Sequence, residues 1–417
     1  MNQKLRLVIL IILALFISAL ISRNAALAWM TLPFLFYLGA GLLTAPQEVS
    51  LSASRTVSLF RCEAGTPVTM TVTIVNHGPA IPNLRVCESF HPKIRLSSRF
   101  KEPCGILPAG GEMKGEYIFQ APRGQYCWEN IRVTVSDPFG LFDKTIELAA
   151  EAELLVLPGQ VRVKPPEFHP RHTIRAPGAN LSRLPGSGID FFGVRAYYPG
   201  DPLRWIHWRL SARYPKQLFS KEFEREEMAD ICLILDGAAA MNLKNETQEL
   251  FEVSVEAAAV LAQGILRAGN RLSMLLLGNR VVRVFPGTGK HQLAHILNQL
   301  AACEPGENVN LNMLKYLPVK LFPRRALIIL VTPLRINDTP AIARLLARGY
   351  QVLIVSPDPV KFTNRCLRQS LAVRAAVVER TAQLWHLRKL GARVFEWPVD
   401  QPQSTEREKR IQHLEER

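Results

Sequence analysis

Two uncharged apolar runs stand directly behind one another near the start of the chain, and they constrain its fold more than any other feature. The first extends from Leu7 to Ser22 and the second from Ala25 to Ala45, with two polar residues between them. About 20 apolar residues in a helix cross the hydrocarbon core of a bilayer. The short polar break therefore predicts a transmembrane helical hairpin over residues 1–46, with spans at about 5–22 and 25–45.

A cleavable signal peptide is the alternative interpretation of the first run. Lys4 and Arg6 precede it, and Ala26-Leu27-Ala28 has the small residues of a cleavage site. Cleavage there would leave a second uncharged run, which favours anchoring. Positive residues stay on the cytoplasmic side, and Arg55 and Arg61 follow the hairpin. We therefore expect a two-pass protein of the inner (cytoplasmic) membrane with its soluble domains in the cytoplasm.

The soluble part is expected to hold two domains, because a chain of 417 residues exceeds one compact core. Residues 47–158 contain short runs rich in Val, Ile, Thr and aromatics, cut by turn clusters at His77–Pro79 and Pro108–Gly111. This pattern predicts an all-β sandwich. Four of the chain's 7 cysteines fall there, and in the cytoplasm they are expected to be thiols; they are Cys62, Cys87, Cys104 and Cys127.

Strands and helices alternate over residues 231–400. The strands are continuous apolar runs, which indicates burial on both faces in a doubly wound, mainly parallel α/β sheet. Strands are expected at 231–235, 272–277, 281–285, 326–331, 351–355 and 393–396, and helices at 246–268, 289–301, 338–347 and 377–390. Residues 159–230 are predicted to be an extended linker followed by a distinctive segment, and residues 401–417 a charged tail.

The formal charge of +15 is spread along the chain, and no recognised nucleic-acid-binding motif accompanies it. Distributed positive charge suits a protein held at the anionic cytoplasmic leaflet. We therefore expect a membrane and protein partners, with no nucleic acid. No small-molecule substrate emerges from the sequence.

The densest local signal lies between Arg195 and Arg213. Pro199-Gly200 is typical of a type II turn, and Asp201 is expected to cap a helix that begins at Pro202. The helix would carry apolar stripes and a rim of arginines.

This segment, together with a second motif, resembles the bacterial family of domain of unknown function 58. The residues of the first motif are Arg195, Tyr198, Pro199, Gly200, Asp201, Arg204, His207, Trp208, Ser211 and Arg213. The second motif begins with Asp137, Pro138, Phe139 and Gly140. The order of parts is similar over nearly the whole chain. The resemblance implies a membrane-associated protein, a partner of the MoxR-type AAA+ ATPase class, and a von Willebrand factor A-like fold for residues 231–400.

Von Willebrand factor A-like domains commonly hold a metal-ion-dependent adhesion site, and the sequence departs from that pattern. Asp236 is followed by glycine and alanines where two serines belong, and the later strand runs into Thr332-Pro333 where an aspartate belongs. Asp236 is the one ligand that clearly remains, with Thr288 a weaker match. A divalent cation prefers six or more oxygen ligands, so we expect a degenerate site with no metal, and we expect no cofactor.

The main hypothesis is a non-catalytic, membrane-anchored scaffold whose distinctive segment and A-like domain dock on an AAA+ ATPase to assemble or remodel other complexes. A hydrolase is one alternative, with Asp201 and His207 beside Ser187 or Ser211. A module that binds anionic membrane surfaces is the second alternative.

Overall fold

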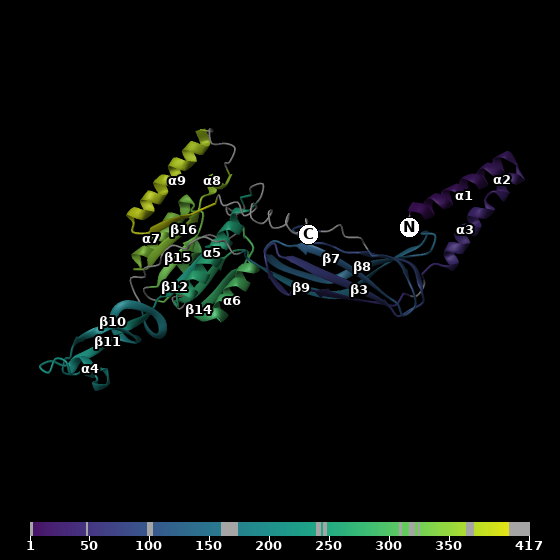
Figure 1. The fold of residues 1–417 in the computed structure, drawn as a ribbon. Coiled ribbons are helices and arrows are strands. Elements are labelled where there is room, and N and C mark those ends of the chain that lie inside the picture. The colour runs from purple at the N-terminus through teal and green to yellow at the C-terminus, as the bar shows by residue number, and fades with distance from the viewer. Residues whose placement is uncertain are drawn as a thin grey trace, which may run out of the picture. The chain divides into compact units, whose positions relative to one another are not determined.

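The computed structural model describes residues 3–46, 49–97, 103–159, 174–238, 243–244, 248–307, 311–316, 322–323, 326–363 and 371–399, without the side chains of 174–190, 224–227, 312, 315–316, 336 and 363. The chain divides into two compact units, Met1–Leu157 and Pro158–Arg417. Figure 1 shows helices and a β domain in the first unit, and a β ribbon and an α/β domain in the second.

Three helices form the N-terminal hairpin: α1 (Gln3–Ser22), α2 (Ala25–Trp29) and α3 (Leu32–Leu43). Arg23 adopts a positive φ of 46°, and the Asn24 side chain accepts a hydrogen bond from the Ala26 amide at 3.0 Å. The turn is therefore closed by a helix cap. Gln3–Ser22 and Ala25–Leu43 are long and apolar enough to cross a membrane, and they coincide with the two predicted spans.

The β domain is built from two sheets that share one hydrophobic core. Their strand orders are β1-β3-β7-β5 and β2-β9-β8-β4-β6. The bounds are β1 (Leu51–Val57), β2 (Arg61–Glu63), β3 (Pro67–Asn76), β4 (Ile81–Cys87), β5 (Arg95–Leu96), β6 (Cys104–Leu107), β7 (Glu112–Gln120), β8 (Gly124–Ser136) and β9 (Asp143–Leu157). Every second residue of β3 is buried, and these residues share the core with Val133 and Val135 of β8. The predicted sandwich is therefore observed, and its four cysteines are free thiols.

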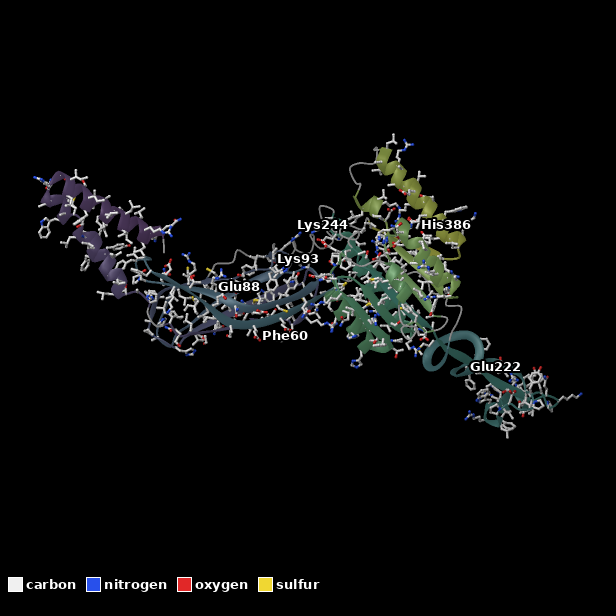
Figure 2. All side chains as sticks on the ribbon, turned by 180° about the vertical axis from the view of Figure 1, so that it is seen from behind. Phe60, Glu88, Lys93, Glu222, Lys244 and His386 are labelled. Carbon is white, nitrogen blue, oxygen red and sulfur yellow. The ribbon has the colours of Figure 1, made fainter. Side chains whose placement is uncertain are left out.

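A buried ion pair links the two sheets. Arg55 of β1 contacts Glu88, just after β4, at 2.6 Å, with side-chain exposures of 0% and 1%. Arg55 also donates to the carbonyls of Ala150 and Asn130, in the second sheet. The sequence had suggested Arg55 as a flanking charge beside the membrane; it lies inside the sandwich instead, where burial raises the pKa of Glu88 (labelled in Figure 2).

A two-stranded antiparallel ribbon occupies most of the segment predicted to be an extended linker. Its strands are β10 (Ile174–Ala196) and β11 (Phe219–Met228), with short helices η1 (Leu203–Trp205) and α4 (Trp208–Ser211) between them. The linker prediction was wrong for β10, because its prolines and glycines hid the strand period. Register shifts fall beside Pro185 and Gly186, where bulges accommodate such residues.

The α/β domain has one six-stranded sheet of order β14-β13-β12-β15-β16-β17. Its strands are β12 (Asp230–Asp236), β13 (Arg271–Leu277), β14 (Val281–Gly287), β15 (Leu327–Val331), β16 (Gln351–Pro357) and β17 (Arg393–Trp397). Its helices are α5 (Leu250–Arg267), α6 (Gly289–Ala301), η3 (Leu311–Tyr316), η5 (Ile336–Asp338), α7 (Thr339–Ala347), α8 (Pro359–Thr363) and α9 (Leu371–Lys389). All strand pairs are parallel except β13 with β14.

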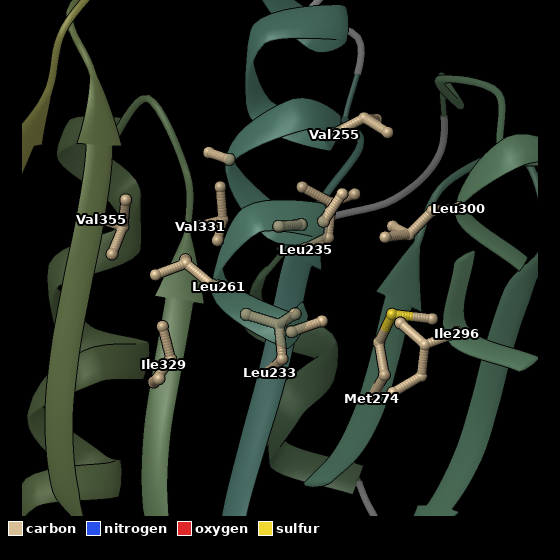
Figure 3. Close-up of a cluster of buried hydrophobic side chains, with 14 of the residues drawn as sticks. Leu233, Leu235, Val255, Leu261, Met274, Ile296, Leu300, Ile329, Val331 and Val355 are labelled. Atoms are coloured by element: carbon tan, nitrogen blue, oxygen red, sulfur yellow. The ribbon is translucent and has the colours of Figure 1, made fainter. Parts of the chain in front are cut away.

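Helices cover both faces of this sheet. Leu233 and Leu235 of β12 pack with residues of α5 and α6 on one face, as Figure 3 shows. Cys232 and Ile234 pack with residues of α7 and α9 on the other. The alternating pattern and mainly parallel sheet predicted from the sequence are observed. Helix α9 begins at Leu371, six residues earlier than predicted.

We predict that Arg55→Met destabilises the β domain by about 3–5 kcal/mol, because it leaves the buried Glu88 carboxylate without its cation. Hydrogen exchange at β1 and β9 amides of the full chain measures this loss. The matched double variant Arg55→Met with Glu88→Leu should recover most of it, since no unpaired charge remains. Equal protection in Arg55→Met and the natural protein would contradict a stabilising role for the pair.

Candidate functional site

The predicted site residues of the first motif gather where β10 turns into β11. We call residues 197–218 the ribbon tip. Its backbone is fastened to the ribbon, because the Tyr197 amide donates to Leu218 at 2.8 Å and the His207 amide donates to Phe219 at 2.8 Å. Ile206 bridges to Ser220 and is buried, so strand pairing interrupts the continuous helix predicted here.

Asp201 does not cap a helix, contrary to the prediction. One carboxylate oxygen accepts a hydrogen bond from Arg195 at 2.6 Å, and the other accepts from the Tyr198 amide at 3.1 Å. The type II turn is present, because the Asp201 amide donates to the Tyr198 carbonyl at 3.0 Å across Pro199 and a glycine, Gly200, with φ of 110°. Asp201 therefore closes the turn and holds Arg195.

Arg195 is the centre of a small charge cluster. Besides Asp201, its guanidinium contacts Glu222 of β11 (labelled in Figure 2) at 3.0 Å and lies 5.4 Å from the centre of the Tyr198 ring. The hydrogen bond from Arg195 lowers the pKa of Asp201, and the same bond raises the pKa of Arg195. The cluster is charged at neutral pH, and it fixes the end of the ribbon tip that adjoins β10 and β11. The sequence motif contained Arg195 and Asp201, but Glu222 was missed because it comes from the return strand.

Two further polar residues of the motif, His207 and Ser211, are also engaged with the backbone. His207 caps α4, since its Nδ1 accepts from the Leu210 amide at 3.1 Å. The Ser211 hydroxyl accepts from the Phe219 amide at 3.0 Å and is buried. Within the described residues, no hydrogen bond joins Asp201 to His207. Ser187 has no described side chain.

With Asp201, His207 and Ser211 engaged by internal hydrogen bonds, the ribbon tip presents apolar and cationic side chains. The exposed apolar residues are Tyr198 (65%), Leu203 (70%), Trp208 (66%), Tyr214 (57%) and Leu218 (45%). The exposed cationic residues are Arg204, Arg209, Arg213 and Lys216. The predicted cationic rim is therefore present. The predicted packing on the α/β domain stays a prediction, because the contacts described above run to β10 and β11.

The second motif forms the turn between β8 and β9. The buried Asp137 side chain accepts from the amides of Phe139 at 3.1 Å, Leu141 at 2.7 Å and Phe142 at 2.7 Å. Pro138 lies inside this turn, and Gly140 has φ of 67°. The role of Asp137 in this turn is structural, because its one carboxylate accepts the backbone hydrogen bonds that organise the loop.

That turn meets the hairpin. The rings of Tyr37 and Phe139 lie 5.1 Å apart, edge to face. A Cβ atom at Gly41 of α3 would lie 2.9 Å from the Leu141 side chain, so α3 and this turn approach closely at the glycine. The motif therefore joins α3 to the β domain.

A second candidate site lies at the carboxyl ends of β12 and β15, where the strand order reverses. Such points are the usual ligand crevices of open α/β sheets. Asp236 accepts hydrogen bonds from Thr332 at 2.9 Å and from the Ala238 amide at 3.1 Å. Arg335 lies 3.6 Å from Asp236 and 3.6 Å from Asp338. The sequence comparison with adhesion sites had not identified Arg335.

Arg335 supplies a positive charge beside the two acidic side chains. Burial raises the pKa of Asp236 and of Asp338, while Arg335 acts to lower both. Among the described residues, no group of three or more His, Cys, Asp or Glu side chains is arranged to hold a metal. The arrangement suits charge compensation by a guanidinium, and the expectation of no metal stays a prediction.

We predict that Arg335→Met lowers the local stability of β12 and β15 by about 2 kcal/mol at neutral pH. This is less than for a fully buried pair, because about a third of the Arg335 side chain is exposed. Burial gives both carboxyls a higher pKa folded than unfolded, so folding favours their protonated forms. Unfolding free energy therefore falls as pH rises from about 3.9 through the folded pKa, and more steeply in the variant.

Hydrogen exchange of β12 and β15, corrected for intrinsic rates, gives the measurement. The matched variants are Arg335→Lys, which keeps the charge, and Arg335→Met with Asp236→Asn, which should recover part of the loss. A defect in Arg335→Met that does not change with pH would argue against the electrostatic role.

The ribbon tip and the α/β domain as far as β16 lie within the region matched by a known family model. The family described as "Protein of unknown function DUF58" matches residues 193–361. The uncharacterized protein YeaD of Bacillus subtilis (strain 168) is 26% identical over 307 residues, covering 70% of this chain and 74% of the relative. The uncharacterized protein Rv1480 of Mycobacterium tuberculosis is 28% identical over 125 residues, covering 30% of this chain and 39% of the relative.

Similarity to solved structures is weak. Proximal thread matrix protein 1 from the mussel byssus matches 31% of this chain and 35% of its own, at 12% identity and a TM-score of 0.24, which carries no information about the fold. The family resemblance rests on the model match and the Bacillus relative. These two findings, with the first predicted motif inside the matched region, support the predicted resemblance of the chain to the DUF58 family.

Proposed function

We propose that this protein is a membrane-anchored docking protein, and that the ribbon tip is the surface that engages its protein partner. The observation that carries the proposal is the division of the tip into two layers. Arg195, Asp201, His207 and Ser211 hold the backbone from within, while aromatic and cationic side chains face solvent.

The composition of the outer layer supports a protein interface. Tryptophan, tyrosine and arginine dominate binding hot spots, because they bury large areas and still form polar contacts. Trp208 and Tyr214 are more than half exposed and are flanked by cations. Such a surface suits an acidic partner face with apolar pockets. The family resemblance makes a MoxR-type AAA+ ATPase the partner we propose, in the assembly or remodelling of other complexes.

The hydrolase alternative has less support from the same geometry. A general base must be free to take a proton from a nucleophile. Here Nδ1 of His207 accepts a backbone hydrogen bond, and the Asp201 carboxylate is bound to Arg195. Docking explains these engaged groups without further assumptions.

We also propose that the α/β domain is von Willebrand factor A-like with a degenerate adhesion site. Its central parallel strands and the antiparallel β14 at one edge support this assignment. Arg335 would then stand in for the cation. Partner contact would depend on surface side chains and would need no bridging metal.

Anchoring at the inner membrane completes the proposal. The hairpin helices expose large apolar side chains, such as Leu13 (55%) and Phe36 (77%), which suit a lipid environment. The charge rule applied to Lys4 and Arg6 directs both units to the cytoplasm.

We predict that Trp208→Ala weakens binding of the full chain to the MoxR-type ATPase of the same organism by about 30-fold, the effect of losing a hot-spot residue worth roughly 2 kcal/mol. Surface plasmon resonance with the chain held in nanodiscs measures the dissociation constant. Phe285→Ala is the matched control, because Phe285 is 67% exposed on β14, outside the tip.

Charge reversal tests the cationic rim separately. Arg204→Glu should slow association and reduce its salt dependence, while leaving the fold of the tip intact. Unchanged binding in both Trp208→Ala and Arg204→Glu would show that the tip is not the docking surface.

We predict that alkaline phosphatase fused after Leu157 is inactive in a periplasmic reporter assay, because two crossings return the chain to the cytoplasm. Fusion after Arg23, between the two spans, is the paired control and should be active. Strong activity after Leu157 would reverse the topology and place the β-domain cysteines in an oxidising compartment.

A further inference from the structure

Helix α9 is apolar on two opposite faces. Its inner face packs in the α/β domain through Leu384 and Leu387. Its outer face carries exposed Leu371 (83%), Val378 (68%) and Trp385 (58%), spaced by seven residues. Alanines at 375 and 382 complete the stripe with alternating spacings of four and three, the spacing of one helix face. A surface helix normally has a single apolar face, so the outer stripe needs a second partner.

The sequence of this stretch is strongly basic, and Asp358 and Glu396, just outside it, contact Lys361, Arg380 and Arg388. Between residues 359 and 393 the sequence has one acidic residue, Glu379, against eight basic ones: Lys361, Arg365, Arg368, Arg374, Arg380, Arg388, Lys389 and Arg393. Arg380 is buried, where its guanidinium bonds to Pro333 and Ser356 and lies 3.3 Å from Asp358. Arg374, Arg388 and Lys389 are exposed beside the stripe.

Trp385 has the character of a residue at a membrane interface. The Lys389 ammonium lies 4.2 Å from the centre of its ring, so an aromatic body and a cationic tip stand together at the end of the stripe. This pairing suits the boundary between acyl chains and anionic headgroups. His386, labelled in Figure 2, marks the same end of α9.

We propose that the outer face of α9 lies on an anionic lipid surface, with Leu371, Val378 and Trp385 inserted at the headgroup boundary and Arg374, Arg388 and Lys389 on the lipid phosphates. Basic amphipathic helices with aromatic apolar faces bind membranes in this manner. A second copy of the chain fits less well, because it would bring two basic faces together. The inference rests on the proposed membrane anchoring, which keeps lipid nearby.

The test places a photo-crosslinking amino acid, p-benzoylphenylalanine, at Val378 of the full chain in nanodiscs. Phosphatidylglycerol-containing nanodiscs are compared with pure phosphatidylcholine, and adducts are identified by mass spectrometry. We expect lipid adducts that are enriched with phosphatidylglycerol. Arg374→Ser and Arg388→Ser should each reduce the lipid adduct by up to about fivefold, the value of one cation at an anionic surface.

Two control positions separate this inference from the proposed anchoring. The same crosslinker at Phe285, exposed on the far edge strand β14, should give little lipid adduct. At Phe16 of α1 it should give lipid adduct in both nanodiscs if the hairpin is in the bilayer. Lipid adduct at Phe16 with none at Val378 would overturn the α9 inference alone, and absence at both would overturn the anchoring. An adduct at Val378 with a second copy or another protein would also overturn it.

Discussion

The α/β domain depends on complete burial of β12. All seven residues of this strand are buried, so the sheet must be covered on both faces, and helices from both sides supply that cover. The same burial carries the strand's last side chain, Asp236, out of water. A carboxylate there needs hydrogen bonds and a positive charge, which Thr332 and Arg335 provide. The hydrogen bonds and the positive charge around Asp236 are therefore a consequence of the burial of β12.

Buried arginines recur as internal cations. Arg55 joins the two sheets of the β domain through Glu88, and Arg380 ties α9 to the ends of β15 and β16 through Pro333 and Ser356. Such ion pairs add little net stability compared with apolar residues of similar size. Removing one partner strongly destabilises the fold, because it leaves a buried charge unpaired, and this favours one arrangement of the neighbouring elements. Arg195 differs, since it is half-exposed and organises a surface.

In the part of the chain that the structure describes, we single out three surfaces with exposed apolar side chains, and each has a different character. The hairpin spans carry no charge beyond Lys4 and Arg6 near their start, the ribbon tip mixes aromatic rings with arginines, and α9 sets an apolar stripe that includes Trp385 beside a basic flank. Exposed apolar area of this kind marks interaction sites. Under our proposals the first and third surfaces face lipid and the tip faces protein, so one chain would hold a partner close to the membrane.

The sequence by itself determined the elements with strong periodic signals: the two apolar spans, the alternating strands of the sandwich and the buried strands of the α/β sheet. These are local properties of hydrophobic spacing. The sequence also located both motifs. It misassigned the role of Asp201, because the same carboxylate can either cap a helix or pair with Arg195, and in the structure it pairs with Arg195. Only the tertiary structure decided such partners. Glu222 reaches Arg195, and Arg335 reaches Asp236, from strands or loops distant in sequence, and no local pattern encodes which charges folding brings together.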